Sequence, residues 1–278
     1  MLARSLTICA DDYGLTQAVT GGILEAVEAG RLHATGAMTT RPNWKVAARD
    51  LASLGEAVQA GLHLDLTLGP ALTGLPALTR NGRLPTILQM IRMAHAGQLP
   101  EAELRAEIGA QIDAFGTHFG SAPAFIDGHQ HVHMLPGIRE WLFDEAAKRG
   151  LAGKIWMRDS ADRMSRILTR GVEVPKAMTV ALAGRGFGAR AHAQGFVTNE
   201  GFAGFSAFDP RRDYAADFVR FLQAPGERHL IMCHPGRVDA ELERLDPATY
   251  SREQELEFLL SDRFADLLAG ASLRGATS

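Results

Sequence analysis

The stretch DGHQHVH, residues Asp127–His133, marks a place where a strand gives way to a helix. It holds three of the ten histidines of the chain. The apolar residues 124–126 before it predict the end of a buried strand, and Pro136 after it suits the first turn of a helix that reaches about residue 150. Imidazole is the commonest metal ligand and the usual acid or base near neutral pH. The stretch therefore predicts a metal-binding or catalytic site.

Two backbone conformations would gather the side chains of this stretch in different ways. In an extended strand Asp127, His129, His131 and His133 share one face, because side chains alternate with a period of two. In a helix His129 and His133 align at i, i+4. Either conformation concentrates ring nitrogens in a small volume, and a solvated polar loop is the alternative without function.

Length and composition place the chain among ordinary globular proteins. It has 278 residues, of which 46% are hydrophobic and 22% charged. The net charge of −3 gives no electrostatic footprint for nucleic acid. No apolar run is long enough for a transmembrane segment, and the first residues enter a strand almost at once. We therefore expect a cytoplasmic protein without a signal peptide, and a homodimer stays open.

The two cysteines, Cys9 and Cys233, both lie in apolar segments that are typical of strands. In a cytosolic protein two buried free thiols are the expected state. Each cysteine stands close to a polar motif residue, so a disulfide between them stays open at this level.

Apolar runs and helical periodicity alternate along the chain without a linker or an internal repeat, which predicts a single domain over residues 1–278. Strands are expected at residues 6–10, 34–39, 58–64, 124–126, 154–158, 196–197 and 229–233. Helices are expected at residues 16–30, 44–54, 86–96, 100–119, 136–150, most of 162–192, 210–222 and 252–268, followed by a frayed tail at 272–278. About seven βα units favour a parallel α/β sheet.

Polar motifs follow the first, third, fourth and seventh of these strands. An open doubly wound sheet gathers its site at one switch point between a few strands. In a closed barrel every βα loop opens onto the same face, so motifs from the whole chain can meet. The distribution therefore predicts an irregular (β/α) TIM-like barrel.

Two long connections lack the pattern of a helix or a strand. Residues 67–85 are rich in Gly and Pro and are a candidate lid or substrate loop. Residues 198–208 contain Phe202, Phe205 and Phe208, which either pack a small core or bind the apolar faces of sugar rings. The sequence leaves both interpretations of these rings open.

Asp11 and Asp12 end the first strand, where an N-cap or a turn is the alternative to a functional role. Adjacent residues on a strand point to opposite faces, so one carboxylate can bind a metal while the other stays free as a base. Gly14 follows closely and favours a site at this strand end.

Three further strands also end in polar residues. His63 is either a buried core histidine or a ligand, and Asp65 is placed to orient its ring. His234 follows an apolar strand and precedes Pro-Gly, which suits a rigidly held general acid. Arg158 and Asp159 close the fifth strand and either orient a substrate or form a surface salt bridge.

At these residues the sequence resembles the YdjC/ChbG/HpnK family of carbohydrate deacetylases. The resemblance rests on four ordered motifs, and residues 252–256 also resemble the C-terminal helix of the family. These motifs are ADDYGL at residues 10–15, GLHL at 61–64, DGHQHVH at 127–133 and CHPG at 233–236. The resemblance covers nearly the whole chain and implies an irregular (β/α) barrel that removes acetyl groups from N-acetylated amino sugars with a divalent metal.

The resemblance also implies a role for each motif residue. It implies metal ligation by Asp12, His63 and His129, catalysis by Asp11 as base and His234 as acid, and substrate-binding or supporting roles for His131, His133, Arg158, Phe202 and Phe205. Cys9, Tyr13 and Thr20 stand where the family often has Asn, Phe and Asn, and these departures bear on the substrate rather than on the metal.

Two histidines and one carboxylate leave coordination positions open for water and a substrate oxygen. The mixed N/O set suits zinc, and the family behaviour keeps magnesium open. An oligosaccharide, a glycolipid intermediate and a nucleotide sugar are all compatible substrates. The alternatives are an Fe(II) oxygenase, whose metal triad has the same composition, and a non-catalytic sugar-binding barrel.

Overall fold

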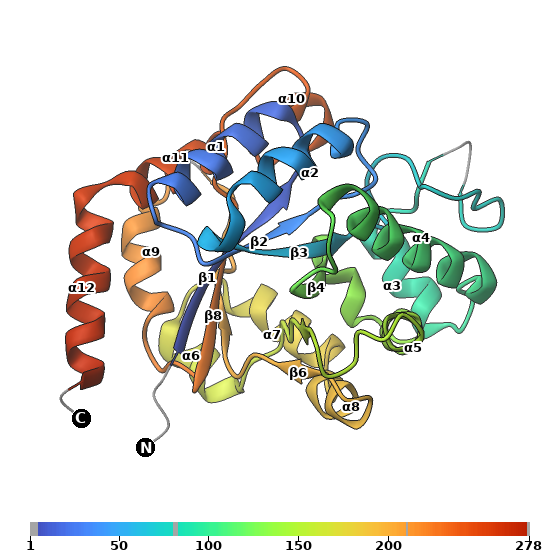
Figure 1. Cartoon of the computed structure of the whole chain (residues 1–278). Helices are drawn as coiled ribbons and strands as arrows, with labels where there is room; N and C mark the ends of the chain where they lie inside the picture. Colours follow the sequence, from blue (N-terminus) through green and yellow to red (C-terminus); the bar gives the residue numbers. More distant parts are fainter. Residues whose placement is uncertain (1–4, 80–82, 210, 277–278) are drawn as a thin grey trace.

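A computed structural model describes residues 5–79, 83–209 and 211–276 of the chain (Figure 1). In this part eight strands form one sheet with the order β6-β5-β4-β3-β2-β1-β8-β7, and every neighbouring pair is parallel. The strands are β1 (Ser5–Tyr13), β2 (Ala34–Ala37), β3 (Gln59–Leu64), β4 (Phe125–Gly128), β5 (Trp156–Met157), β6 (Val197–Thr198), β7 (Phe202–Ala203) and β8 (Arg228–Cys233).

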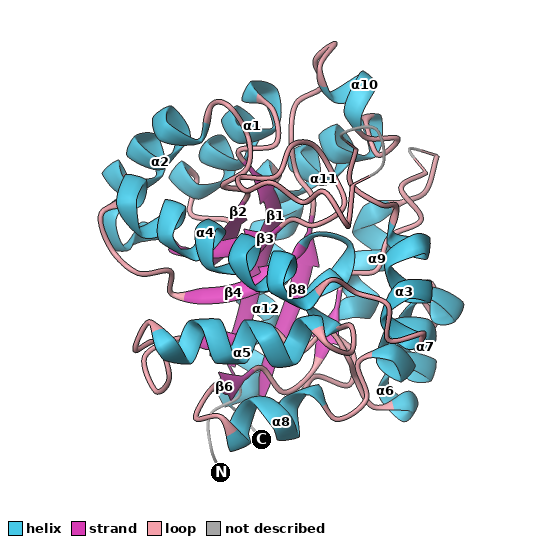
Figure 2. Cartoon of the chain, turned by 90° about the vertical axis from the view of Figure 1, so that its right-hand side faces the viewer, coloured by secondary structure: helices cyan, strands magenta, loops and turns pink. Residues whose placement is uncertain are grey.

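Helices surround the curled sheet, as Figure 2 shows. They are α1 (Gln17–Glu28), α2 (Trp44–Ser53), η1 (Gly55–Ala57), α3 (Ile87–His95), α4 (Glu101–Phe119), η2 (His129–Met134), α5 (Ile138–Lys148), α6 (Met164–Arg170), α7 (Val174–Ala183), α8 (Phe187–Ala193), α9 (Tyr214–Phe221), α10 (Leu242–Leu245), α11 (Tyr250–Leu260) and α12 (Asp262–Ala276). This single α/β domain confirms the predicted irregular (β/α) barrel. No helix in the described residues has the length and hydropathy to cross a membrane.

The strand β7 is the main departure from the predicted seven βα units. It lies inside the segment predicted as a loop at residues 198–208, and it pairs with β8 at only two positions. β6 and β7 are the two edge strands of the sheet, and only residues 199–201 separate them. A linker of this length can span at most roughly 15 Å, so the two edges lie close together. The amide of Asn199 accepts from the N–H of Asp159 and donates to its carbonyl. The side chain of Asn199 thus extends the pairing between β5 and β6.

The C-terminal region differs from the single helix predicted at residues 252–268. It folds as α11 and α12, and α12 continues to Ala276. The frayed tail predicted at residues 272–278 is therefore helical as far as Ala276, and residues 277–278 lie outside the described part. Ser261 separates the two helices with an extended ψ of 156°.

Alternation along the strands divides the core into two parts. Cys9 and Met232 are paired neighbours in β1 and β8 and pack in a small inner core with Ile167 of α6. Ala10 and Cys233 are the next paired neighbours and pack in the large core. Cys9 and Cys233 therefore belong to opposite faces of the sheet, and both are buried free thiols.

Three carboxylates, two of them buried, hold the first part of the long connection after β3. Oδ1 of Asp65 accepts from the N–H groups of Thr67 and Leu68. Glu107 of α4 accepts from the N–H groups of residues 72 and 73 and from the hydroxyl of Thr73. Glu103, one turn earlier, accepts from the N–H groups of residues 77 and 78. This segment is therefore bound to α4 rather than hanging as a free lid, and residues 80–82 lie outside the described part.

A buried histidine away from the strand ends predicts a pH-dependent stability. Nε2 of His229 donates to the carbonyl of Phe221 at 2.9 Å, and burial lowers the pKa of His229 to about 4. In the unfolded chain its pKa is about 6.5, so unfolding takes up a proton as the pH falls through this window and stability is lost. Between pH 7 and pH 5 the free energy of unfolding should fall by about 2 kcal/mol more in the native chain than in His229→Gln. Urea titrations at the two pH values measure this difference, and equal slopes would contradict it.

Candidate active site

The alternation of the strands brings a layer of polar side chains to the carboxyl end of the barrel. Asp11 lies two residues beyond Cys9 on the inner face of β1, and Asp127 lies two residues beyond Phe125 on β4. His63 of β3 is the direct pairing partner of Asp127. All three polar side chains are buried. The period of two therefore places them above the apolar inner core without any special loop structure.

A bulge brings Asp12 to the same group although its neighbour Asp11 already points inward. The register of β1 against β2 shifts between Ala10 and Tyr13, and Asp12 has a φ of 70°. A bulge of this kind redirects a side chain that regular alternation would send to the other face. Oδ1 of Asp12 then lies 3.3 Å from Nε2 of His63 and 2.9 Å from Nδ1 of His129.

The histidine-rich stretch adopts neither of the two conformations considered from the sequence. β4 ends at Gly128, and Gln130 and His131 have φ values of 52° and 59°, which belong to the left-handed region. This turn sends the three histidines to different places. His129 reaches Asp12, and Nε2 of His133 donates to the carbonyl of Arg158 at 2.9 Å.

Asp12, His63 and His129 have the donor set and the spacing of a metal site. One ligand atom from each lies within 4.8 Å of the others, and all three residues are buried. Nδ1 of His63, the nitrogen turned away from this group, lies 2.7 Å from Oδ1 of Asp127. A carboxylate behind a metal-binding histidine fixes its ring orientation and tautomer. The residues therefore fit a divalent metal, and the carboxylate that orients His63 is Asp127, whereas Asp65 is engaged in the loop that follows β3.

A buried guanidinium, that of Arg158, binds the second carboxylate, Asp11. The terminal nitrogens of Arg158 lie 2.7 and 2.6 Å from the two oxygens of Asp11. One of them also lies 2.5 Å from Oδ2 of Asp127 and 3.0 Å from Sγ of Cys9. Cys9, Asp11 and Asp127 also cluster as ligand-type residues, but Arg158 already binds all three. Through these bonds Arg158 orients Asp11. Arg158 is 0% exposed, so it cannot contact a sugar as predicted from the sequence.

The carboxylates and histidines of the site have perturbed pKa values with identifiable causes. Burial raises the pKa of Asp12, but Arg252 and His129 outweigh it and hold that pKa well below its usual range. Burial raises the pKa of Asp11 against the opposing effect of Arg158. Burial lowers the pKa of His63, but the neighbouring carboxylates outweigh it and leave the pKa well above its usual range.

His234 follows β8 directly and lies on the opposite side of Asp12 from Arg158 in the order of strands. Its N–H donates to Oε2 of Glu255 at 2.7 Å, and its ring lies edge-on to Phe208 at 5.0 Å. The ring nitrogen Nδ1 is buried without a hydrogen-bond partner among the described residues. Burial lowers the pKa of His234 well below its usual range, so the ring is neutral in the free protein.

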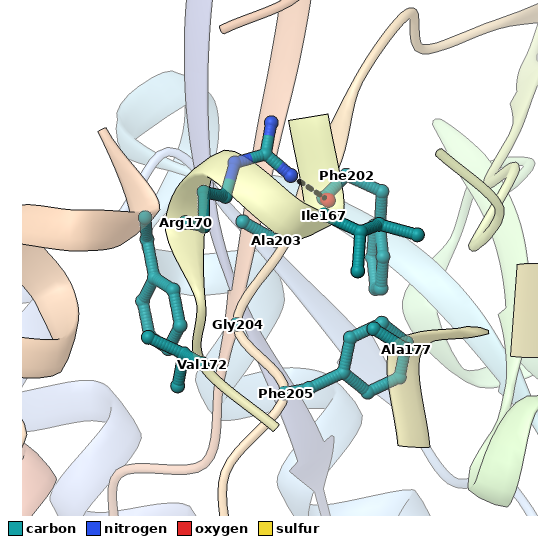
Figure 3. Close-up of a pocket in the computed structure, with 9 residues that line it drawn as sticks. Ile167, Arg170, Val172, Ala177, Phe202, Ala203, Gly204 and Phe205 are labelled. Carbon is teal, nitrogen blue, oxygen red and sulfur yellow. Dashed lines mark hydrogen bonds between the residues drawn. The ribbon is translucent and has the colours of Figure 1, made fainter. Parts of the chain in front are cut away.

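Of the other residues predicted to bind substrate, His133, Phe202 and Phe205 are packed side chains, whereas His131 is partly exposed. His133 is 0% exposed and holds the carbonyl of Arg158. Phe202 and Phe205 are 1% and 5% exposed, and their rings lie edge-on to each other and to His131. Figure 3 shows both phenylalanines beside Ile167 at a recess of about 10 Å³, which has room for a single water molecule at most. The packing interpretation of these two rings is therefore the one that the geometry supports.

Three residues of the site carry no role in the sequence-based interpretation. Arg252 and Glu255 of α11 reach Asp12 and the backbone of His234. Gly36 of β2 lies directly beneath the pair formed by His63 and Asp127. A glycine inside a strand is a known sign of close approach, whereas the two α11 residues have only the resemblance of residues 252–256 to indicate them.

Comparison with known proteins identifies the family of this barrel with its Asp-His-His group. The family described as YdjC-like protein matches residues 5–270. The chain is 33% identical to a chitooligosaccharide deacetylase of Salmonella newport strain SL254, and the alignment covers 99% of this chain and 96% of that protein. The corresponding protein of Salmonella typhimurium strain LT2 is also 33% identical, with the same coverage. This chain belongs to the YdjC-like family.

A solved structure from Enterococcus faecalis V583 has the same fold. That protein is provisionally described as a cellobiose-phosphate cleavage protein, and it superposes with a TM-score of 0.74 over 96% of this chain and 95% of that one. The sequence identity is 23%, so the likeness concerns the fold. It agrees with the irregular barrel described above.

Gly36 provides a test of the packing beneath the site. A Cβ at this position would lie 3.1 Å from Oδ1 of Asp127 and 3.1 Å from Nδ1 of His63, so the pair would have to move. Gly36→Ala should lower the free energy of unfolding by roughly 1–3 kcal/mol, the usual effect of overpacking, and should shift the NMR ring resonances of His63. Gly21→Ala is the matched control, because a Cβ on that helical residue meets nothing within 4 Å. Unchanged His63 resonances in Gly36→Ala would contradict the tight packing.

Proposed function

We propose that this protein is a metal-dependent carbohydrate deacetylase that removes the acetyl group from an N-acetylated amino sugar of the chitooligosaccharide class. The observation that carries the proposal is the position of Asp11. Arg158 holds this carboxylate beside the buried Asp12–His63–His129 group, which has the composition of a catalytic metal site. The curated relatives named chitooligosaccharide deacetylases support the substrate class over a free glycolipid or a nucleotide sugar.

Asp12, His63 and His129 would hold one divalent metal ion. When bound, the ion would polarise the acetamide carbonyl and increase the acidity of the attacking water. Two ring nitrogens and one carboxylate oxygen favour zinc, and magnesium is the alternative that elemental analysis of the purified protein would distinguish.

Asp11 is the proposed base. Its carboxylate has both oxygens fixed by Arg158, so it faces the reacting water in one orientation. Burial raises its pKa, which makes it a stronger proton acceptor than an exposed aspartate. A base fixed in this way needs no rearrangement at the moment of proton transfer.

His234 is the proposed donor to the leaving amine. Hydrolysis of the amide transfers one proton of the water to the amine nitrogen, so a group opposite the base must deliver it. His234 stands at the end of β8 with Nδ1 unpartnered. Its ring is neutral in the free protein because burial lowers its pKa, so it must gain this proton within the enzyme–substrate complex.

The metal assignment predicts a loss of binding when one ligand is removed. His63→Ala and His129→Ala should each lose stoichiometric Zn²⁺ in equilibrium dialysis and should release no acetate from N-acetylated chitooligosaccharides. His118→Ala is the control, because this histidine lies exposed on α4. Full metal occupancy in either ligand variant would remove the basis of the assignment. Metal binding without acetate release by the native chain would favour the oxygenase or sugar-binding alternatives.

Substitution of the two adjacent aspartates should affect different properties, turnover for Asp11 and metal affinity for Asp12. Asp11→Asn should keep the metal but lose turnover by roughly 10²–10⁴-fold, the contribution of a positioned base. Asp12→Asn should weaken the metal affinity, because the ligand oxygen loses its charge. Dialysis against Zn²⁺ and acetate release measure the two effects separately. The opposite pattern would mean that the two aspartates exchange roles.

A further inference from the structure

Helix α11 contributes two buried charged side chains to the site from the far end of the chain. Arg252 and Glu255 are three residues apart and share one face of the helix. Each is only 1% exposed. Buried charges of this kind are costly unless each one has a partner, so their partners indicate why they are there.

Arg252 holds the oxygen of Asp12 that faces away from the two histidines. Its terminal nitrogen Nη2 lies 2.6 Å from Oδ2 of Asp12 and 2.9 Å from Oδ2 of Asp246, and its Nε donates to the carbonyl of Ala248 at 2.8 Å. Oδ1 of Asp12 is the oxygen near His63 and His129. The two oxygens of Asp12 therefore have separate partners, which fixes the rotation of its carboxylate.

Glu255 holds the other side of the site through the backbone. Its Oε2 accepts from the N–H of His234 at 2.7 Å, and the carbonyl of Arg252 accepts from the N–H of Gly236 at 3.2 Å. The turn after β8 is thus attached to α11 at both of its ends. Burial raises the pKa of Glu255 to about 7.

We propose that α11 is a positioning element of the active site, in which Arg252 fixes the metal-ligating carboxylate of Asp12 and Glu255 fixes the backbone of His234. The inference rests on the proposed function of the site. Neither residue touches the reacting atoms, and both act through another residue. Stability alone does not explain a buried ion pair, because apolar side chains of similar volume often stabilise a fold equally well.

The sign of the change in metal affinity tests the role of Arg252. Removing a cation beside a ligand would by Coulomb's law strengthen the binding of Zn²⁺, whereas releasing a positioned ligand would weaken it. Arg252→Met should therefore bind Zn²⁺ roughly 10- to 100-fold more weakly in equilibrium dialysis, the usual loss when a residue behind a metal ligand is removed. Arg252→Lys keeps the charge but not the planar fork, and should also bind more weakly than the native chain.

A second buried arginine supplies the structural control. Arg170 is 4% exposed and binds Asp162 and three backbone carbonyls away from the metal ligands. Arg170→Met should lower the melting temperature without changing the affinity for Zn²⁺. Equal or tighter binding of Zn²⁺ by Arg252→Met would overturn the positioning role. If Arg252→Met fails to fold, native affinity in Arg252→Lys would overturn it instead.

The role of Glu255 is tested by turnover at full metal occupancy. Glu255→Ala leaves the N–H of His234 without its acceptor, and kcat should fall by up to roughly 100-fold with KM and Zn²⁺ affinity unchanged. Glu255→Gln retains an acceptor oxygen and should recover most of kcat. In Glu255→Asp the shorter side chain does not reach the N–H of His234, so kcat should fall as in the alanine variant. This variant tests the role of Glu255 if Glu255→Ala does not fold.

Glu253 of the same helix is the matched control for Glu255. Its carboxylate accepts from the N–H of Val238 at 3.3 Å, which is the same kind of bond to the same connection. Glu253→Ala should retain the native kcat. Native kcat in a folded Glu255→Ala or Glu255→Asp would overturn the inference. Failure of the native chain to bind Zn²⁺ or release acetate would instead overturn the proposed function.

Discussion

The structure depends on how three buried carboxylates are neutralised at the carboxyl end of the barrel. Asp11, Asp12 and Asp127 are each no more than 2% exposed, and two guanidiniums, Arg158 and Arg252, lie among them. Among these five groups the carboxylates outnumber the guanidiniums by one. In the free protein His63 compensates for this difference, because the neighbouring carboxylates raise its pKa. A divalent metal ion would compensate the same carboxylates, with His63 deprotonated as a ligand.

The same charges explain why this part of the backbone departs from regular structure. Asp12, Gln130 and His131 all have positive φ, which costs each residue about 1–2 kcal/mol relative to the ordinary conformations. Such conformations persist only where the surrounding contacts determine them. Here Asp12 reaches His63 and Arg252, and the turn at Gln130 allows His129 to reach Asp12. The strain lies where the side chains must converge.

The sequence determines which strand ends carry the site but not how their side chains are aimed. Asp11 and His63 could be predicted, because a period of two continues the inward pattern of an apolar strand. The barrel class could be predicted because polar motifs follow strands along the whole chain. The bulge at Asp12 and the left-handed turn at His131 could not, since both conformations depend on partners from other strands. The two-residue strand β7 is set by β8 and by Arg170, not by its own propensity.

Contacts between the ends of the chain make the site dependent on the complete fold. Asp12 and Arg252 are 240 residues apart, and β1 pairs with β8 along six positions. Contacts of such separation form only after the intervening chain has been ordered, because closing the loop costs entropy before any contact compensates for it. Oδ2 of the buried Asp12 would lack its arginine partner until α11 docks. The Asp12–His63–His129 group therefore reaches its final arrangement only when α11 has docked.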